Sequence, residues 1–378
     1  MTAGLIIGAA CLLLGITYFL MIQWVIRQWH ELPVFEPTPM EAYPSVTVLV
    51  AARNEAANIH QCLQALSQQN YPKASLQIIV IDDHSTDATA EMVEAFPHPN
   101  LTLLRLPAGQ YGKKRALELG AAATQSTYLM TTDADCQPPP LWVQGQVQHL
   151  ESRQLAASTG PVLLTGADNL RYRFQALDMA GMMVLTAVGL HTGTWVLGNG
   201  ASLAYRRAAF EAAGGYADNR GTASGDDIFL IAKITRGQGL PVRFLKSATV
   251  AVPTPAAPDW SAFFRQRLRW GTKNAAAPAS AGTTFALGVA FLLSWSILLS
   301  PLLFLAVGHF WLVVLGLLLL LKSGADYRLL KTACQFFHQE HLLKSFARSE
   351  ALHIGYIAFI GLASLFVRKY QWKGRSVH

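Results

Sequence analysis

The chain has 378 residues, of which 52% are hydrophobic and only 14% are charged, with 30 Lys and Arg against 23 Asp and Glu. Because a soluble globular domain usually carries about 25% charged residues, this composition excludes an ordinary soluble enzyme and indicates that part of the chain lies in lipid. It also excludes intrinsic disorder, since a chain this apolar buries enough surface to fold. The four cysteines lie far apart with no Cys-x-x-Cys pair, which excludes a disulfide scaffold and a zinc cluster.

The N-terminal segment, residues 1–26, contains no Asp, Glu, Lys or Arg. A helix that crosses a hydrocarbon core of about 30 Å needs roughly 20 such residues, so this segment predicts one transmembrane helix. A cleaved signal peptide is the alternative, but it requires a basic segment and a small-residue cleavage site, and neither precedes Arg27. We therefore expect a membrane anchor.

Residues 40–273 are long enough for one α/β domain of normal size. Short β-branched runs predict parallel strands, and apolar residues at helical spacing predict helices between them. The expected strands are 45–51, 76–81 and 128–130, and the expected helices are 58–69 and 113–123. Repeats of strand, helix and strand form a Rossmann-like, mostly parallel sheet whose ligands bind at the carboxyl ends of the strands.

Acidic clusters follow these predicted strands, and Asp133-Ala134-Asp135 is the sharpest of them. Two carboxylates two residues apart, just past a strand, suit one hard cation such as Mg²⁺ or Mn²⁺. The chain has no Gly-rich phosphate loop, so a nucleotide diphosphate held through a metal is the natural hypothesis. A solvated loop is the alternative for each cluster taken alone. Cys136 is expected to be a packed thiol, and His84 is expected to be structural.

Further membrane segments are predicted after the α/β domain. The uncharged run 274–321 is over twice as long as a bilayer core is thick, and it predicts a transmembrane hairpin at 282–322 with turn points at Ser300-Pro301 and Gly308-His309. Residues 323–350 are expected to be interfacial or cytoplasmic, and residues 351–367 to cross the membrane or re-enter it.

Two segments of the α/β domain are expected to be interfacial helices. Residues 171–197 are apolar with basic flanks but interrupted by Gly and His, which argues against a membrane span; a plain core helix is the alternative. Residues 259–273 interleave aromatic and cationic side chains, as helices at lipid headgroups do.

Basic residues flank the predicted spans on one side, which the positive-inside rule makes cytoplasmic. They are Arg27, Arg265, Arg267, Arg269, Lys273, Lys322, Arg328, Lys331, Lys344 and Arg348. We therefore expect an integral protein of a bacterial-type inner or plasma membrane, with the α/β domain in the cytoplasm. The net charge of +7 indicates attraction to anionic headgroups and not to nucleic acid.

Taken in order, six motifs resemble the membrane-bound branch of glycosyltransferase family 2, which includes cellulose, hyaluronan and chitin synthases and ceramide glucosyltransferases. They are AARNE at 51–55, IDDHSTD at 81–87, GKKRAL at 112–117, DAD at 133–135, SGDD at 224–227 and QRLRW at 266–270. The resemblance covers residues 45–274. SGDD stands where the family more often has a Glu-Asp pair, and QRLRW matches the family's QxxRW.

The resemblance implies a GT-A fold and an inverting, metal-dependent hexosyltransferase that uses a nucleotide sugar, with a UDP-sugar preferred. It implies nucleotide-sugar contacts from Ala52, Glu55, Asp83, Lys113, Asp133, Gln266, Arg269 and Trp270. It implies metal ligation by Asp135 and Asp133, a general base at Asp227, and catalytic roles for Asp226 and Arg269, with Asp226 the less secure. It places Trp270, Gly198 and Asn199 on the acceptor side.

The acceptor remains open at this point. A membrane-lipid acceptor is favoured, because three or four spans are few for a channel of its own. The alternative is a processive polysaccharide synthase that extrudes its product, with the growing glycan as acceptor. A third alternative, from another class, is a catalytically inactive membrane scaffold or nucleotide-sugar sensor. This alternative predicts that at least one motif is broken, and the intact catalytic positions argue against it.

Overall fold

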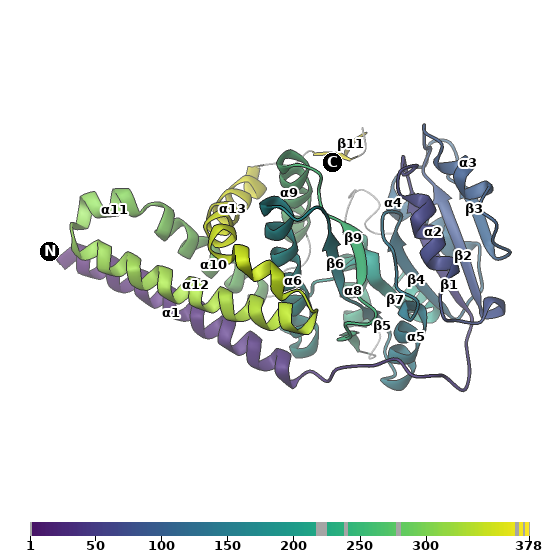
Figure 1. The fold of residues 1–378 in the computed structure, drawn as a ribbon, viewed down its shortest axis with the longest axis horizontal. Coiled ribbons are helices and arrows are strands. Elements are labelled where there is room, and N and C mark those ends of the chain that lie inside the picture. The colour runs from purple at the N-terminus through teal and green to yellow at the C-terminus, as the bar shows by residue number, and fades with distance from the viewer. Residues whose placement is uncertain are drawn as a thin grey trace. The chain divides into compact units, whose positions relative to one another are not determined.

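The computed structural model describes residues 2–216, 225–237, 241–276, 281–366, 370–372 and 375–377. The chain divides into two compact units, described separately below (Figure 1). The α/β unit comprises Pro33–Thr165, Val196–Pro255 and Lys369–His378, and the helical unit comprises Met1–Leu32, Gly166–Trp195 and Ala256–Arg368.

The α/β unit is built on a seven-stranded sheet with the order β3-β2-β1-β4-β7-β5-β8. Six strands run in the same direction, while β7 runs antiparallel to its neighbours β4 and β5. Their bounds are β1 Val46–Ala52, β2 Leu76–Asp82, β3 Leu101–Arg105, β4 Tyr128–Asp133, β5 Ala157–Thr159, β7 Leu203–Arg206 and β8 Val242–Phe244. The expected strands and the mostly parallel sheet are confirmed. The edge strand β3 was not predicted, because its residues are only half-buried and polar ones interrupt them.

Helices cover this sheet and a second, two-stranded sheet lies beside it. The helix α4 packs on β1 and β2, and Gly120 makes the close approach possible, because a Cβ there would lie 2.8 Å from Ile81 Cδ1 and 2.9 Å from Leu49 Cδ2. The helices are α2 Ile59–Ser67, α3 Thr89–Glu94, α4 Lys113–Ala122, α5 Trp142–Ser152, α7 Arg207–Ala212 and α8 Asp226–Gly237. The parallel pair β6 Val162–Thr165 and β9 Val252–Pro255 and the hairpin β10 Tyr370–Trp372 and β11 Arg375–Val377 complete the unit.

The helical unit contains long apolar helices, and α1 and α12 lie side by side along most of their length (Figure 1). Its helices are α1 Thr2–Glu31, α6 Leu170–Thr192, α9 Trp260–Ala276, α10 Ala281–Leu298, α11 Ser300–Val307, α12 Phe310–Phe336 and α13 Phe346–Phe366. Among the described residues, four segments are long and apolar enough to cross a membrane: Gly4–Glu31, Leu170–Thr192, Ala281–Leu298 and Phe310–Phe336. Both expected turn points, at residues 300–301 and 308–309, separate helices, with the short α11 between them.

The structure differs from expectation in α6. The interruptions by Gly and His do not break it: α6 is one helix of 23 residues with 78% of its apolar window buried. The glycines serve close packing, since a Cβ at Gly189 would lie 2.1 Å from the Trp195 ring and one at Gly181 would lie 3.2 Å from Leu330 of α12. Residues 171–197 were expected to form an interfacial helix, and this burial is typical of the alternative, a core helix.

A second difference concerns two cations that were assigned to the membrane flanks. Lys322 is 1% exposed and donates to Asp326 and Glu350, and Arg267 is 2% exposed and pairs with Asp178. Neither side chain is available to headgroups. Helix α12 continues through Lys322 to Phe336, so it includes part of the segment 323–350 that was expected to be interfacial or cytoplasmic.

Candidate active site

The carboxyl ends of β1, β2 and β4 meet at one edge of the sheet. In the register of the sheet, Ala52 pairs with Asp82 and Ala51 pairs with Asp133. The loops that follow the three strands therefore emerge together, and they carry the predicted acidic clusters. The sheet thus brings Glu55, Asp83 and Asp133 to a common edge, as the sequence predicted.

Asp83 is 1% exposed and held at this edge by backbone groups. Its own N–H donates to Ala52 O at 2.8 Å, and its Oδ2 accepts from the N–H of Gly112 at 2.9 Å. His84, which was predicted to be structural, places its Nδ1 3.2 Å from Oδ1 of Asp83, a predicted site residue. Arg53 donates to the carbonyl oxygens of Asp83 and His84 at 2.6 and 2.8 Å. The contacts of His84 and Arg53 with Asp83 depend on the conformation of the loops after β1 and β2, so they could not be predicted from the sequence.

The loop after β1 positions Glu55. The Glu55 N–H donates to Thr89 Oγ1 at 2.8 Å, and its Oε2 accepts from Asn58 Nδ2 at 2.9 Å, just before α2 begins. Asn54 adopts a left-handed backbone with φ of 51°, and its N–H donates to Ser85 Oγ at 3.0 Å. Such conformations persist where the surroundings hold them, as these cross-loop bonds do here.

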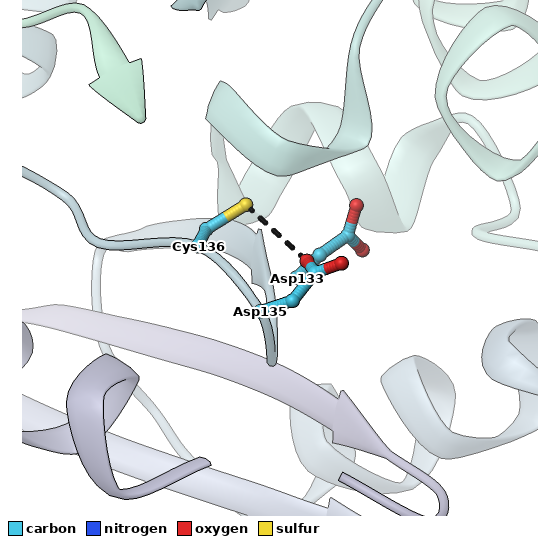
Figure 2. Close-up of side chains that lie close together, drawn as sticks. All are labelled: Asp133, Asp135 and Cys136. Carbon is cyan, nitrogen blue, oxygen red and sulfur yellow. Dashed lines mark hydrogen bonds between the residues drawn. The ribbon is translucent and has the colours of Figure 1, made fainter. Parts of the chain in front are cut away.

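Asp133 ends β4, and Asp135 and Cys136 follow it (Figure 2). Ligand atoms of the three side chains lie within 4.8 Å of one another. Lys113, the first residue of α4, places its Nζ 2.6 Å from Asp133 Oδ1, while 42% of the Asp133 side chain stays exposed. Burial and the Asp135 carboxylate raise the pKa of the Cys136 thiol well above its usual value, which keeps it protonated. Cys136 is fully buried, and the oxygen atoms of this cluster belong to the carboxylates of Asp133 and Asp135.

Asp227 lies in the first turn of α8 and is tied to the loop before β7. Its Oδ2 accepts from the Gly200 N–H at 3.1 Å, and the Gly200 carbonyl accepts from Thr131 Oγ1 at 2.7 Å. Because Thr131 lies two residues before Asp133 on β4, this chain of bonds links Asp227 to the acidic strand end. Gly198 lets this loop pass close to α8, since a Cβ there would lie 2.4 Å from Ile231 Cδ1.

Two further predicted site residues, Asn199 and Asp226, lie next to Gly198 and Asp227 in the chain, and only Asn199 has a described side chain. Asn199 accepts from the Ala201 N–H at 3.0 Å and so shapes the same loop. Asp226 is the first residue of α8, but its side chain, like Ser224 of the SGDD motif, lies outside the described residues.

Gln266, Arg269 and Trp270 belong to α9 of the helical unit. At positions i, i+3 and i+4 they share one face of that helix. The intervening Arg267 has its guanidinium 4.2 Å from the centre of the Trp270 ring. The resemblance gave no role to Arg267, and only its burial draws attention to it.

Comparison with known proteins identifies the α/β region: residues 47–212 match the family described as Glycosyl transferase family 2. The chain carries a glycosyltransferase family 2 domain. This domain contains the three strand-end clusters and the loop of Gly198 and Asn199, while Asp227 and the QxxRW residues follow it.

Relatives of the family 2 domain are glycosyltransferases by name. The chain is 27% identical to the probable glycosyltransferase YdaM of Bacillus subtilis, over 69% of this chain and 60% of that protein. It is 30% identical to a beta-monoglucosyldiacylglycerol synthase of Synechocystis sp., over 51% of this chain and 40% of that protein. The chain therefore spans about three fifths or less of the length of these curated relatives.

The fold around the family 2 domain also has a solved counterpart. The mannosyltransferase PcManGT from Pyrobaculum calidifontis, solved with GDP-Man and Mn²⁺, aligns with 95% of this chain and 98% of its own, at a TM-score of 0.59 and 20% identity. The GT-A fold expected from the sequence is thereby confirmed.

Proposed function

We propose that this chain transfers a hexose from a nucleotide-diphosphate sugar, preferably a UDP-sugar, to a hydroxyl group of a membrane lipid, with inversion at the sugar carbon. The observation that carries the proposal is the linked arrangement of acids in the α/β unit. Asp133 and Asp135 stand at the end of β4, and Asp227 is tied through Gly200 to Thr131 of the same strand. A donor site and a base are thereby held by one framework.

The residues around Asp133 fit a hard divalent cation such as Mg²⁺ or Mn²⁺. Two carboxylates offer oxygen ligands within 4.8 Å of each other, and the exposed part of Asp133 leaves room for water and diphosphate oxygens. Asp135 is the residue proposed to bind the ion directly, because Lys113 already occupies one oxygen of Asp133. When bound, the ion would offset the negative charge of the diphosphate leaving group.

The chain's own residues supply the remaining parts of the donor site. We assign Ala52, Glu55 and Asp83 to the base and ribose of the nucleotide, because they sit where the strands of a nucleotide-binding sheet end. Lys113 and Arg269 stabilise the charge that develops on the leaving diphosphate. Gln266 and Trp270 contact the diphosphate and the acceptor, with Gly198 and Asn199 on the acceptor side.

Asp227 is the proposed general base, and Asp226 its less secure neighbour. As the acceptor oxygen forms its bond to the sugar carbon, the hydroxyl proton passes to the Asp227 carboxylate and the bond to the diphosphate breaks. Attack opposite the leaving group inverts the anomeric centre without a covalent enzyme intermediate. The N–H of Gly200 fixes one oxygen of this carboxylate and thereby its orientation.

A lipid acceptor is supported by the apolar helices and by the name of one relative. The segments Gly4–Glu31 and Ala281–Leu298 are only 22% and 17% buried, so most of their apolar surface is available to hydrocarbon. The relative from Synechocystis is named for a glucosyl-diacylglycerol product. We therefore place the protein in a bacterial-type inner or plasma membrane, with the α/β unit in the cytoplasm.

The test is a donor-and-product assay on the full chain in nanodiscs that contain diacylglycerol, with UDP-glucose, UDP-galactose, UDP-N-acetylglucosamine or GDP-mannose and Mn²⁺. Mass spectrometry of the lipids is expected to show diacylglycerol heavier by one sugar. A ladder of longer products instead would establish the processive polysaccharide synthase. If none of these donors is consumed, or if a donor is only hydrolysed and no sugar reaches a lipid or glycan, the proposed transferase activity is contradicted.

Metal removal is tested in the same assay. Chelation is expected to abolish turnover and added Mn²⁺ to restore it, while Asp135→Asn raises the Mn²⁺ concentration needed for half-maximal rate by at least about 10-fold. Glu94→Gln is the matched control, because Glu94 forms an exposed ion pair with Arg105 elsewhere in the α/β unit. Unchanged turnover after thorough chelation would remove the metal from the proposal.

A further inference from the structure

The second residue of the QRLRW motif, Arg267, is the most deeply buried cation of α9 whose side chain is described. It is 2% exposed, although an arginine on a helix of mixed aromatic and basic residues is expected to reach solvent or headgroups. Its Nη2 lies 2.7 Å from Oδ2 of Asp178 on α6, and the Asp178 side chain is itself only 9% exposed. The pair therefore joins α9 to α6 in the interior of the helical unit.

Two aromatic rings of α9 enclose the guanidinium of Arg267. The centre of the Phe263 ring lies 5.0 Å from its central carbon, and the centre of the Trp270 ring lies 4.2 Å from it. These residues stand at i−4 and i+3 from Arg267, so all three share one side of the helix. A planar guanidinium stacks on such rings, which a lysine ammonium does not reproduce.

The neighbouring helix α13 closes the other side of this arrangement. The ring of Phe263 contacts Tyr356 of α13 with a centroid distance of 5.5 Å. A Cβ at Gly271 would lie 3.3 Å from Ser364 and 3.4 Å from Ile360, so α9 and α13 approach closely just after the motif. Helices α6 and α13 thus hold the backbone of α9, while Arg267 bears directly on the Trp270 ring.

We propose that Arg267 and Asp178 are positioning residues for sugar transfer: their buried ion pair fixes the Trp270 ring in the orientation that the reaction requires. The proposal rests on the proposed function, because it assigns Trp270 to the acceptor and diphosphate. It adds two residues to which the resemblance gave no role and which are not proposed to touch the reacting groups. Their effect on the reaction passes through Trp270.

The kinetic test is a double-mutant cycle on the full chain in nanodiscs. Arg267→Lys keeps the charge but loses the planar stack, and it is expected to lower kcat by about 10- to 100-fold, as small misplacements of binding groups do, with donor KM within about 2-fold. In the Trp270→Leu background, the same substitution is expected to change kcat by less than about 3-fold. Independent, multiplying losses would overturn the proposal.

A matched control separates positioning from general stability. Asp178→Asn and Asp326→Asn each remove one carboxylate from a buried ion pair of the helical unit. Per folded molecule, Asp178→Asn is expected to lower kcat at least about 10-fold, and Asp326→Asn to leave kcat within about 2-fold. If the two variants lower kcat equally, the Arg267 pair merely stabilises the unit and the proposal is wrong.

A readout without turnover distinguishes this inference from the proposed function. In protein labelled with 5-fluorotryptophan, the ¹⁹F resonance of Trp270 is assigned by its loss in Trp270→Phe. Arg267→Lys and Asp178→Asn are expected to shift and broaden that resonance, while Asp326→Asn leaves it in place. An unmoved resonance contradicts the positioning contact whether or not the wild-type chain turns over a donor, and an inactive wild type contradicts only the proposed function.

Discussion

In the α/β unit the carboxylates of Asp83 and Asp227 accept hydrogen bonds from backbone N–H groups, whereas in the helical unit Asp178 and Asp326 pair with buried cations. The difference follows from the backbone. Inside a helix the N–H groups are used by the helix itself, so an acid buried between helices needs a charged side chain as partner. At strand ends and helix starts, backbone N–H groups remain available, and they can bind a carboxylate without neutralising its charge.

This difference indicates which carboxylates can take part in a reaction. The carboxylate of Asp227 is oriented by a neutral N–H group, which suits the role of general base proposed for it. In the helical unit, Asp326 is already neutralised by Lys322, so its removal is expected to affect folding more than turnover. Asp133 stands between the two cases, since Lys113 contacts one of its oxygens while much of the side chain stays exposed.

The largest expected effect comes from replacing the proposed base. Asp227→Asn is expected to lower kcat by about 10³-fold, because an amide cannot take the acceptor proton, while the unfolding temperature changes little since its oxygen still accepts from Gly200. Steady-state kinetics with thermal unfolding of the same sample checks both. If Asp227→Asn keeps full turnover, Asp227 is not the base, and acids held by backbone N–H groups do not differ in this way from acids paired with buried cations.

The next effect belongs to the helical unit. Lys322→Met leaves Asp326 and Glu350 buried without their cation and is expected to lower the free energy of unfolding by about 3–5 kcal/mol. The surviving folded molecules should retain their kcat. Thermal unfolding in detergent measures the loss, and Lys322→Arg, which keeps the charge, is the control. A large drop in kcat per folded molecule would show that this pair serves the reaction.

Acid is expected to weaken the α/β unit through His149. Burial, with Arg153 and Arg243 nearby, lowers the pKa of His149 to about 4, and its Nδ1 lies 2.8 Å from Ser158 Oγ. Because the folded pKa lies below the ordinary value of about 6.5, the unfolded chain binds the proton first, so stability is full above pH 6.5 and falls toward pH 4. The linked loss is about 2–3 kcal/mol.

Unfolding midpoints measured from pH 7 to pH 4 check this expectation. His149→Gln, which removes the titrating group, should flatten the fall relative to the wild type. An equally steep fall in that variant would assign the acid sensitivity to other groups and leave the His149 argument without support.

The smallest expected effect lies in the loop that holds Asp227. Gly198→Ala places a methyl group 2.4 Å from Ile231 Cδ1 and is expected to cost about 1–2 kcal/mol of stability. Ile231→Val removes that carbon, so the same substitution should cost much less in this background. Equal costs in both backgrounds would show that the contact is not the reason for glycine.

Much of the α/β unit was predictable, because its evidence is local. The strands around residues 46–52 and 76–82 are continuous β-branched runs, and the acids that follow them must meet once the strands are parallel. The hairpin turns near Ser300 and Gly308 were predictable for the same reason, since Pro and Gly act on their own stretch of chain.

Long-range pairing was not predictable from the sequence. Arg267 was interpreted as a flanking cation because its partner Asp178 lies 89 positions away. Lys322 has one partner four positions away, Asp326, but its burial also depends on Glu350, which lies 28 positions away. The contact of His84 with Asp83 joins neighbours in the chain, and it was hidden for another reason: it depends on the left-handed backbone of His84.

By itself, the sequence determined the apolar helices, the parallel strands and the ordered motifs, because each depends on residues close together in the chain. Only the tertiary structure decided which charges are available. A buried charge is stable only beside a partner, and the identity of that partner is set by packing between distant segments. It is this pairing that separates Asp227, held by a backbone N–H group, from Asp178, held by Arg267.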